Sequence, residues 1–119
     1  MGKFVIKKLA SGYKFHLVTL SGETVATGEV YTTKAACIKG IQGTIRVAPN
    51  APAVDLDAGE TASNPKFEHF TDKGGKFRFR LLARNGKVIA VSTGYRSREG
   101  CLKGIETVRA VVQRAEIEV

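Results

Sequence analysis

Cys101-Leu102-Lys103-Gly104-Ile105 repeats, 64 residues further along the chain, the segment Cys37-Ile38-Lys39-Gly40-Ile41. The correspondence extends beyond these segments, because Tyr31 precedes the first by the same distance as Tyr95 precedes the second. A fixed offset of this length is typical of a duplicated supersecondary unit. The sequence therefore predicts two copies of one structural unit in tandem.

The second copy shows the strands of this unit most clearly. Phe77 to Arg84 alternates apolar and mostly basic residues, which predicts a half-buried antiparallel strand. A short strand over Phe67 to Thr71 precedes it, and a returning strand over Val88 to Ser92 follows. Asn85-Gly86 lies between the last two and predicts a type I′ turn, in which both residues have positive φ.

The first copy repeats this scheme with strands over Tyr13 to Leu20 and Val25 to Glu29, after an opening strand that begins near Lys3. A helix follows in each copy, with Thr33 and Ser97 as suitable N-caps. The helices carry apolar residues at helical spacing, which is typical of a helix that packs on a sheet. These residues are Cys37, Ile41 and Ile45 in the first copy, and Cys101, Ile105, Val108 and Val112 in the second.

Gly40 and Gly104 occupy the middle of the two helices, where each costs about 1 kcal/mol relative to Ala. The same cost at equivalent positions indicates that the helix backbone approaches a neighbour closely. A last short strand follows each helix, over Val54 to Asp57 and over Glu116 to Val119.

The length of 119 residues suits one domain, residues 1–119, built from repeat one (3–57), a linker (58–65) and repeat two (66–119). A unit of about 55 residues with one helix buries too little surface to be stable alone, so we expect the copies to share one core and one sheet. No apolar run is long enough to span a membrane and no signal peptide is visible, which predicts a cytoplasmic protein. We expect either a monomer that is a pseudo-dimer internally or a homodimer.

Two cysteines in a cytoplasmic protein favour free thiols over a disulfide. Cys37 and Cys101 lie on the apolar faces of equivalent helices and are interpreted as small core residues. The alternative is a redox pair across a pseudo-two-fold axis, which requires Cα atoms within about 7 Å of each other.

The positive charge of the chain is concentrated in the second copy. The net charge is +8, with seven Lys or Arg against five Asp or Glu in residues 1–60 and twelve against six in residues 61–119. Five residues on the predicted outer face of the sheet form the candidate nucleic-acid site: Lys14, Arg78, Arg80, Arg84 and Lys87. Arginines two residues apart on a strand are about 6.6 Å apart. This distance approximates the spacing of successive phosphates along a nucleic-acid strand.

The second copy resembles the repeat of the YegP-like proteins, small bacterial and archaeal proteins of uncharacterised function, usually with two tandem copies. The residues that carry the resemblance are the run from Phe77 to Ala90, then Ser92, Tyr95, Ser97 and Gly104-Ile105-Glu106-Thr107-Val108. The first copy is more diverged, since Ser21-Gly22 replaces Asn-Gly and Gln42-Gly43-Thr44-Ile45 departs from the usual end of the motif.

The resemblance implies an α+β fold of two tandem β-β-β-α-β repeats. In such a fold the repeats form one continuous antiparallel sheet with both helices on one face. Each repeat contributes its final, C-terminal strand to the other half, so that these strands are exchanged. The resemblance implies no catalytic residues.

The motif content favours a binding or interaction protein over an enzyme. HExxH, P-loop, GxSxG and Cys-x-x-Cys motifs are absent from the sequence, and we expect no catalytic residue, metal or other cofactor. His16 and His69 lie in predicted strands without evident partners and are interpreted as ordinary polar residues. Two kinds of partner remain open: nucleic acid on the basic face, or a protein on a patch of Val18, Leu20 and Leu82.

Overall fold

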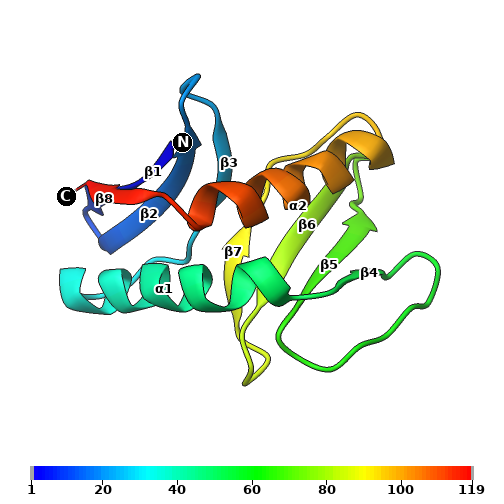
Figure 1. The fold of residues 1–119 in the computed structure, drawn as a ribbon, viewed down its shortest axis with the longest axis horizontal. Coiled ribbons are helices and arrows are strands. Elements are labelled where there is room, and N and C mark those ends of the chain that lie inside the picture. Colours follow the sequence, from blue (N-terminus) through cyan, green and yellow to red (C-terminus); the bar gives the residue numbers. More distant parts are fainter. Residues whose placement is uncertain (1, 119) are drawn as a thin grey trace.

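Three strands precede each of the two helices in the computed structural model, which describes residues 2–118 (Figure 1). Val119, the last residue of the predicted final strand, lies outside the described residues. The first half contains β1 (Gly2–Leu9), β2 (Gly12–Thr19), β3 (Thr24–Thr27), α1 (Lys34–Val47), a 3-10 turn (Ala48–Asn50) and β4 (Ala53–Asp55). The second half contains β5 (Lys66–Thr71), β6 (Phe77–Leu82), β7 (Val88–Val91), α2 (Arg98–Val112) and β8 (Glu116–Glu118).

All eight strands belong to one sheet, in the order β4-β5-β6-β7-β3-β2-β1-β8. The six inner strands pair antiparallel, but β4 runs parallel to β5 and β8 runs parallel to β1. The prediction of an antiparallel sheet is therefore wrong for the two outer strands, and the sheet is mixed. Each outer strand reaches the sheet from a helix instead of a hairpin turn, and such a crossover allows a parallel pair.

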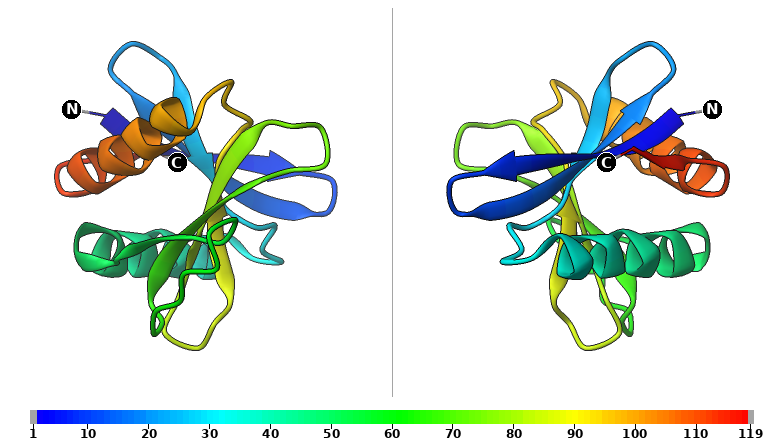
Figure 2. Two further views of the ribbon diagram at one scale, coloured as in Figure 1. Left: turned by 90° about the vertical axis from the view of Figure 1, so that its right-hand side faces the viewer. Right: turned by 90° about the vertical axis from the view of Figure 1, so that its left-hand side faces the viewer.

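Both helices cover the same face of the sheet, and the core lies between these layers (Figures 1 and 2). The alternation predicted for the second copy is confirmed, since Phe79 and Leu81 of β6 are buried. Phe79 packs edge-on against Phe67 with ring centroids 5.9 Å apart. Phe15 packs in the same way against Phe4 of β1, at 5.6 Å.

Cys37 and Cys101 are free and fully buried in this core. Burial raises the pKa of the Cys101 thiol to about 11, and it raises the pKa of Cys37 in the same direction. Because the thiolate is the reactive form, burial makes both side chains poor nucleophiles. The arrangement agrees with their interpretation as small core residues.

Gly40 and Gly104 contact the two repeated tyrosines. A Cβ atom at Gly40 would overlap the Tyr31 hydroxyl, and one at Gly104 would overlap the Tyr95 hydroxyl and ring. The close approach predicted for both helices is thus confirmed, and the neighbour is a tyrosine in each copy. Tyr95 also stacks on Phe79, with ring centroids 6.3 Å apart.

The turn between β6 and β7 differs from the predicted type I′ turn. Gly86 has φ of 83°, but no residue other than glycine has positive φ in the described chain, so Asn85 does not. The Gly86 amide donates to the Ala83 carbonyl at 2.9 Å, and the Ala83 amide donates to the Lys87 carbonyl at 2.8 Å. These contacts define a three-residue loop, a type I turn with a glycine bulge. Strand β6 consequently ends at Leu82, and Arg84 lies in the turn.

Arg98, the first residue of α2, connects this helix to the end of β4. Its guanidinium donates to Asp55 at 3.1 Å and to Asp57 at 2.9 Å, and it lies 3.4 Å from Nδ1 of the buried His69. The Thr71 hydroxyl donates to the same Asp57 carboxylate oxygen that accepts from Arg98, at 2.6 Å. The network holds the chain that leaves the first repeat against a strand and a helix of the second.

Replacing Gly104 by Ala tests its contact with Tyr95. We expect Gly104→Ala to lower the free energy of unfolding by about 1–3 kcal/mol, because the new methyl group would overlap the tyrosine. Gly43→Ala is the matched control, since no atom outside its own stretch of helix lies within 4 Å of its Cβ position. That change should raise the free energy of unfolding by roughly 0.5–1 kcal/mol. Urea unfolding measures both, and a Gly104→Ala protein as stable as the native one would contradict the contact.

Asp57 should make the stability of the protein sensitive to acid. Its hydrogen bonds from the Thr71 hydroxyl and then from Arg98 lower the pKa of Asp57 from 3.8 to about 2. A carboxyl group with a lowered folded pKa stabilises fully above its unfolded pKa, and this contribution is lost as pH falls through the folded pKa. We expect the urea midpoint of the native protein to fall more than that of Asp57→Asn between pH ~4 and pH ~2. Equal falls in the two proteins would refute the role of Asp57.

Candidate nucleic-acid interface

The face of the sheet opposite the helices is the open face, and strand pairing defines its residues. One row of paired residues crosses the centre of this face: Val54, Glu68, Arg80, Val91, Thr27, His16, Val5 and Glu118. Three strand intervals separate Arg80 from His16 in this row, or about 14 Å. Beside the row, Lys14 pairs with Lys7 on one side and Arg78 pairs with Phe70 on the other.

The two arginines of β6 lie on the open face but are paired with carboxylates. Arg78 Nε donates to Asp72 at 2.5 Å, and Arg80 Nε donates to Glu68 at 2.7 Å. Glu68 is nearly buried and also lies 3.4 Å from Lys66 Nζ. Glu29 lies with both arginines around one shallow depression of this face. The predicted row of free arginines is therefore largely neutralised, because Asp72 and Glu68 come from a neighbouring turn and strand.

Arg84 does not extend this row, and the predicted placement is wrong for this residue. The type I turn begins before Arg84, so the alternation of the strand does not reach it. Its side chain lies instead beside α1, in a groove with Lys39 and Arg46. Lys87 is exposed at the other end of the same turn. The binding roles predicted for these five residues stay predictions.

The least compensated charge on the open face lies in the first repeat. Lys14 of β2 stands directly opposite Lys7 of β1, and neither forms an ion pair with a carboxylate of residues 2–118. His16 is the next open-face residue along β2. Burial lowers the pKa of His16, and the positive charges of Lys14 and Lys7 lower it further.

Lys7 was missed in the sequence, although the alternation Phe4-Val5-Ile6-Lys7 contains the signal. Phe4 is buried in the core and Ile6 packs against it, so Lys7 must face the other side of β1. The alternation does not reveal the register between β1 and β2. That register depends on the turn between the two strands, and it brings Lys7 opposite Lys14.

Aromatic and apolar residues contribute little to the open face. The Arg80 guanidinium covers the ring of Phe70, the one aromatic side chain that the described strands place on the open face, at 5.0 Å from its centroid. Val18 and Leu82 lie in β2 and β6, which are separated by β3 and β7. Leu20 lies beyond the end of β2 and is 79% exposed. These three residues therefore do not form the single apolar patch that a protein partner would need.

Two further features of the described residues concern membranes and metals. Neither helix has the length and apolar character needed to cross a bilayer. Between residues 2 and 118, no three His, Cys, Asp or Glu side chains converge in a way that could hold a metal ion.

Sequence comparison finds relatives that share the repeat. The UPF0339 protein of Methanosarcina acetivorans is 59% identical over 54 residues, which cover 45% of this chain and 93% of that protein. The UPF0339 protein YegP of Escherichia coli O157:H7 is 36% identical over 110 residues, covering 92% of this chain and 88% of the relative.

Structure comparison finds the same fold. The solution structure of E. coli yegP, a protein of unknown function, superimposes with a TM-score of 0.81 at 28% identity, covering 98% of this chain and 90% of that one. Residues 10–55 and 72–118 each match a family described as Domain of unknown function (DUF1508). The chain therefore belongs to the DUF1508 family, whose YegP-like members have no named enzymatic activity.

Proposed function

We propose that this protein is a non-enzymatic binding module that holds the phosphate backbone of nucleic acid on the open face of its sheet, around Lys7, Lys14 and His16. The observation that carries the proposal is the direct pairing of Lys7 with Lys14. Like charges opposite each other on adjacent strands destabilise a sheet. A polyanion bound between them would remove this repulsion.

The surroundings of the two lysines support an anionic ligand. His16 lies beside them and faces the same solvent, and its lowered pKa reflects their positive field as well as its partial burial. Phosphate groups near this cluster would neutralise that field. Arg78 and Arg80 lie about three strand intervals away across the same face and could add contacts only by giving up part of their pairing with Asp72 and Glu68.

The shortage of free aromatic rings determines the kind of recognition. Single-strand binders that use base stacking gain about 1–3 kcal/mol per stacked base, and here the Phe70 ring is already covered by Arg80. Contacts from lysines to phosphate carry no sequence information. The proposal is therefore of backbone binding without sequence preference and with a strong dependence on salt.

Charge reversal of the lysine pair tests the proposal. We expect Lys7→Glu with Lys14→Glu to abolish measurable binding of a fluorescent DNA oligonucleotide at physiological salt. The native protein should bind more weakly as salt rises, and replacing the two lysines by Ala should lower the slope of log K against log salt by roughly 1.4–1.8. Fluorescence anisotropy at several salt concentrations measures both effects.

Lys8→Glu is the control, because Lys8 follows Lys7 directly but faces the helix side of β1, opposite Tyr13. It should weaken binding much less than Lys7→Glu. Titration of the His16 imidazole by NMR gives a second readout, since bound phosphate should raise its pKa. Equal losses in the Lys7→Glu and Lys8→Glu proteins, or a His16 pKa that DNA leaves unchanged, would argue against this interface.

A further inference from the structure

We infer that the groove between α1 and the β6–β7 hairpin binds a small amphiphilic anion, with a phosphate or carboxylate group at its basic rim and a hydrocarbon body on its apolar floor. The groove has a volume of about 500 Å³, within the range of roughly 300–1,000 Å³ that is usual for small-molecule sites. It lies on the helix side of the sheet and is separate from the open face.

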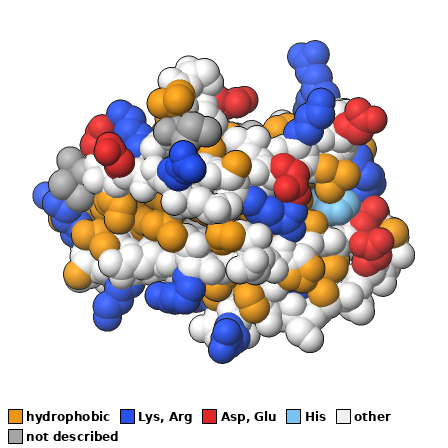
Figure 3. Space-filling model, viewed as in Figure 1, with side chains coloured by type: hydrophobic (Ala, Val, Ile, Leu, Met, Phe, Trp, Pro, Cys, Tyr) orange, Lys and Arg blue, Asp and Glu red, His pale blue; other side chains and the backbone are white. Residues whose placement is uncertain are grey.

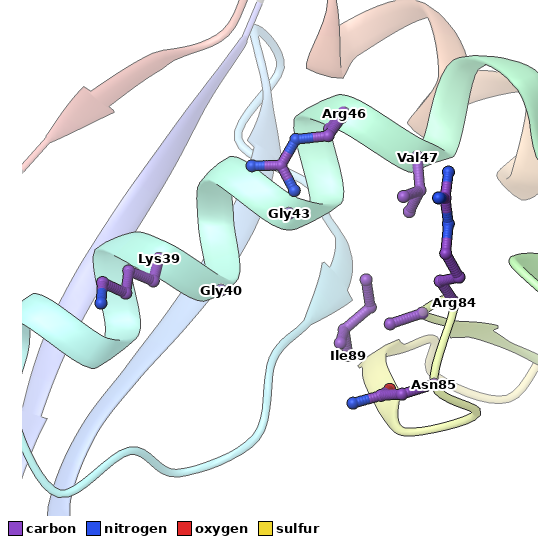
Figure 4. Close-up of a pocket in the computed structure, with 9 residues that line it drawn as sticks. Lys39, Gly40, Gly43, Arg46, Val47, Arg84, Asn85 and Ile89 are labelled. Carbon is purple, nitrogen blue, oxygen red and sulfur yellow. The ribbon is translucent and has the colours of Figure 1, made fainter.

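Two elements that are far apart in the sequence form this groove. Lys39, Gly43 and Arg46 lie along α1, and Arg84 and Asn85 come from the hairpin turn (Figure 4). Figure 4 shows the Arg84 side chain extending from the turn alongside Val47 of α1. The type I turn makes this possible, because it takes Arg84 out of the strand.

The rim of the groove is positive without compensation. Lys39, Arg46 and Arg84 are all exposed, and the lining contains no Asp or Glu. None of the three pairs with a carboxylate of the described chain. Figure 3 agrees, since Lys and Arg side chains project below α1 and the hairpin with no acidic side chain visible among them.

The floor of the groove is apolar and open. Val47, Ala83 and the buried Ile89 supply hydrocarbon surface, and a Cβ atom at Gly43 would meet nothing within 4 Å beyond its own stretch of helix. The Asn85 side chain adds an amide that can donate a hydrogen bond. A mostly apolar concavity lined by a few polar groups suits a ligand with a hydrocarbon part and one charged head.

The equivalent elements, α2 of the second repeat and the β2–β3 hairpin of the first, provide an internal comparison, because the corresponding positions lack these features. Thr107 stands where Gly43 opens the groove, Ala110 replaces Arg46, and Leu20 replaces Arg84. Lys103 is the one cation that corresponds, to Lys39. The fold therefore does not require an open, triply basic groove, and the divergent segment around Gly43 has a functional explanation.

Hexyl phosphate is the probe for this site, with hexanoate, inorganic phosphate and hexanol as comparison ligands. In NMR titrations of the labelled protein, we expect hexyl phosphate at millimolar concentration to shift the amides of Gly40, Gly43 and Asn85 saturably. Inorganic phosphate should bind more weakly and hexanol should cause no such shifts. Tighter binding of hexanoate than of hexyl phosphate would support the site with a carboxylate ligand. Absence of saturable shifts with both anions would overturn the inference.

Variants that copy the residue at the equivalent position of the other repeat test the residues without disturbing the fold. Arg46→Ala and Arg84→Leu should each weaken hexyl phosphate binding about tenfold, as expected for the loss of one charge-assisted hydrogen bond. Gly43→Thr should block the floor while leaving the urea midpoint at or above the native value. Lys39→Ala should weaken binding, whereas the matched Lys103→Ala should not. Unchanged affinity in the Arg46→Ala and Arg84→Leu proteins would refute the site.

Discussion

The two halves of the sheet meet through a single residue pair, Thr27 of β3 and Val91 of β7. The fold therefore depends on the other contacts that connect the two halves. One pair of residues cannot hold two small domains together, and each half alone would bury too little apolar surface. Strand pairs at the two edges of the sheet also connect the halves. The chain segment that ends the first repeat pairs with β5, and the segment that ends the second pairs with β1. Arg98 and Arg109 of α2 also hold the end of the first repeat, through Asp55 and the Ala51 carbonyl.

The residues that lie next to each basic side chain decide where positive charge on the open face remains uncompensated. Carboxylates that come from adjacent strands and turns, such as Glu68 and Asp72, neutralise the arginines of β6. Lys14 occupies the position in the first repeat that Arg78 occupies in the second, but the residue opposite Lys14 on the neighbouring strand is Lys7. The excess of positive charge in the second half of the sequence thus does not become a basic open face in the second half of the sheet. Local pairing, more than net charge, decides which surface can attract a polyanion.

Much of the fold could be predicted from residue patterns, because burial imposes them. Alternation in β6 and helical spacing in α2 reflect contacts with one shared core, and Gly104 reflects a contact with Tyr95. The parallel outer pairs could not be predicted in this way, since residue periodicity does not encode the direction of a neighbouring strand. The ion pairs of Arg78 and Arg80 were missed for a related reason. They depend on register between strands, which the alternation of a single strand leaves open.

The type of the β6–β7 turn decides on which side of the sheet the Arg84 side chain lies. A two-residue type I′ turn would have kept Arg84 in the strand, on the face of Arg78 and Arg80. The observed turn needs positive φ only at Gly86, so Arg84 becomes its first central residue and the side chain reaches α1. The corresponding turn of the first repeat has the same hydrogen bonds around Gly22, but it places Leu20 at that position. Because two turns with the same hydrogen bonds carry different side chains at this position, the fold does not require an arginine there, and the basic groove is not a consequence of the fold alone.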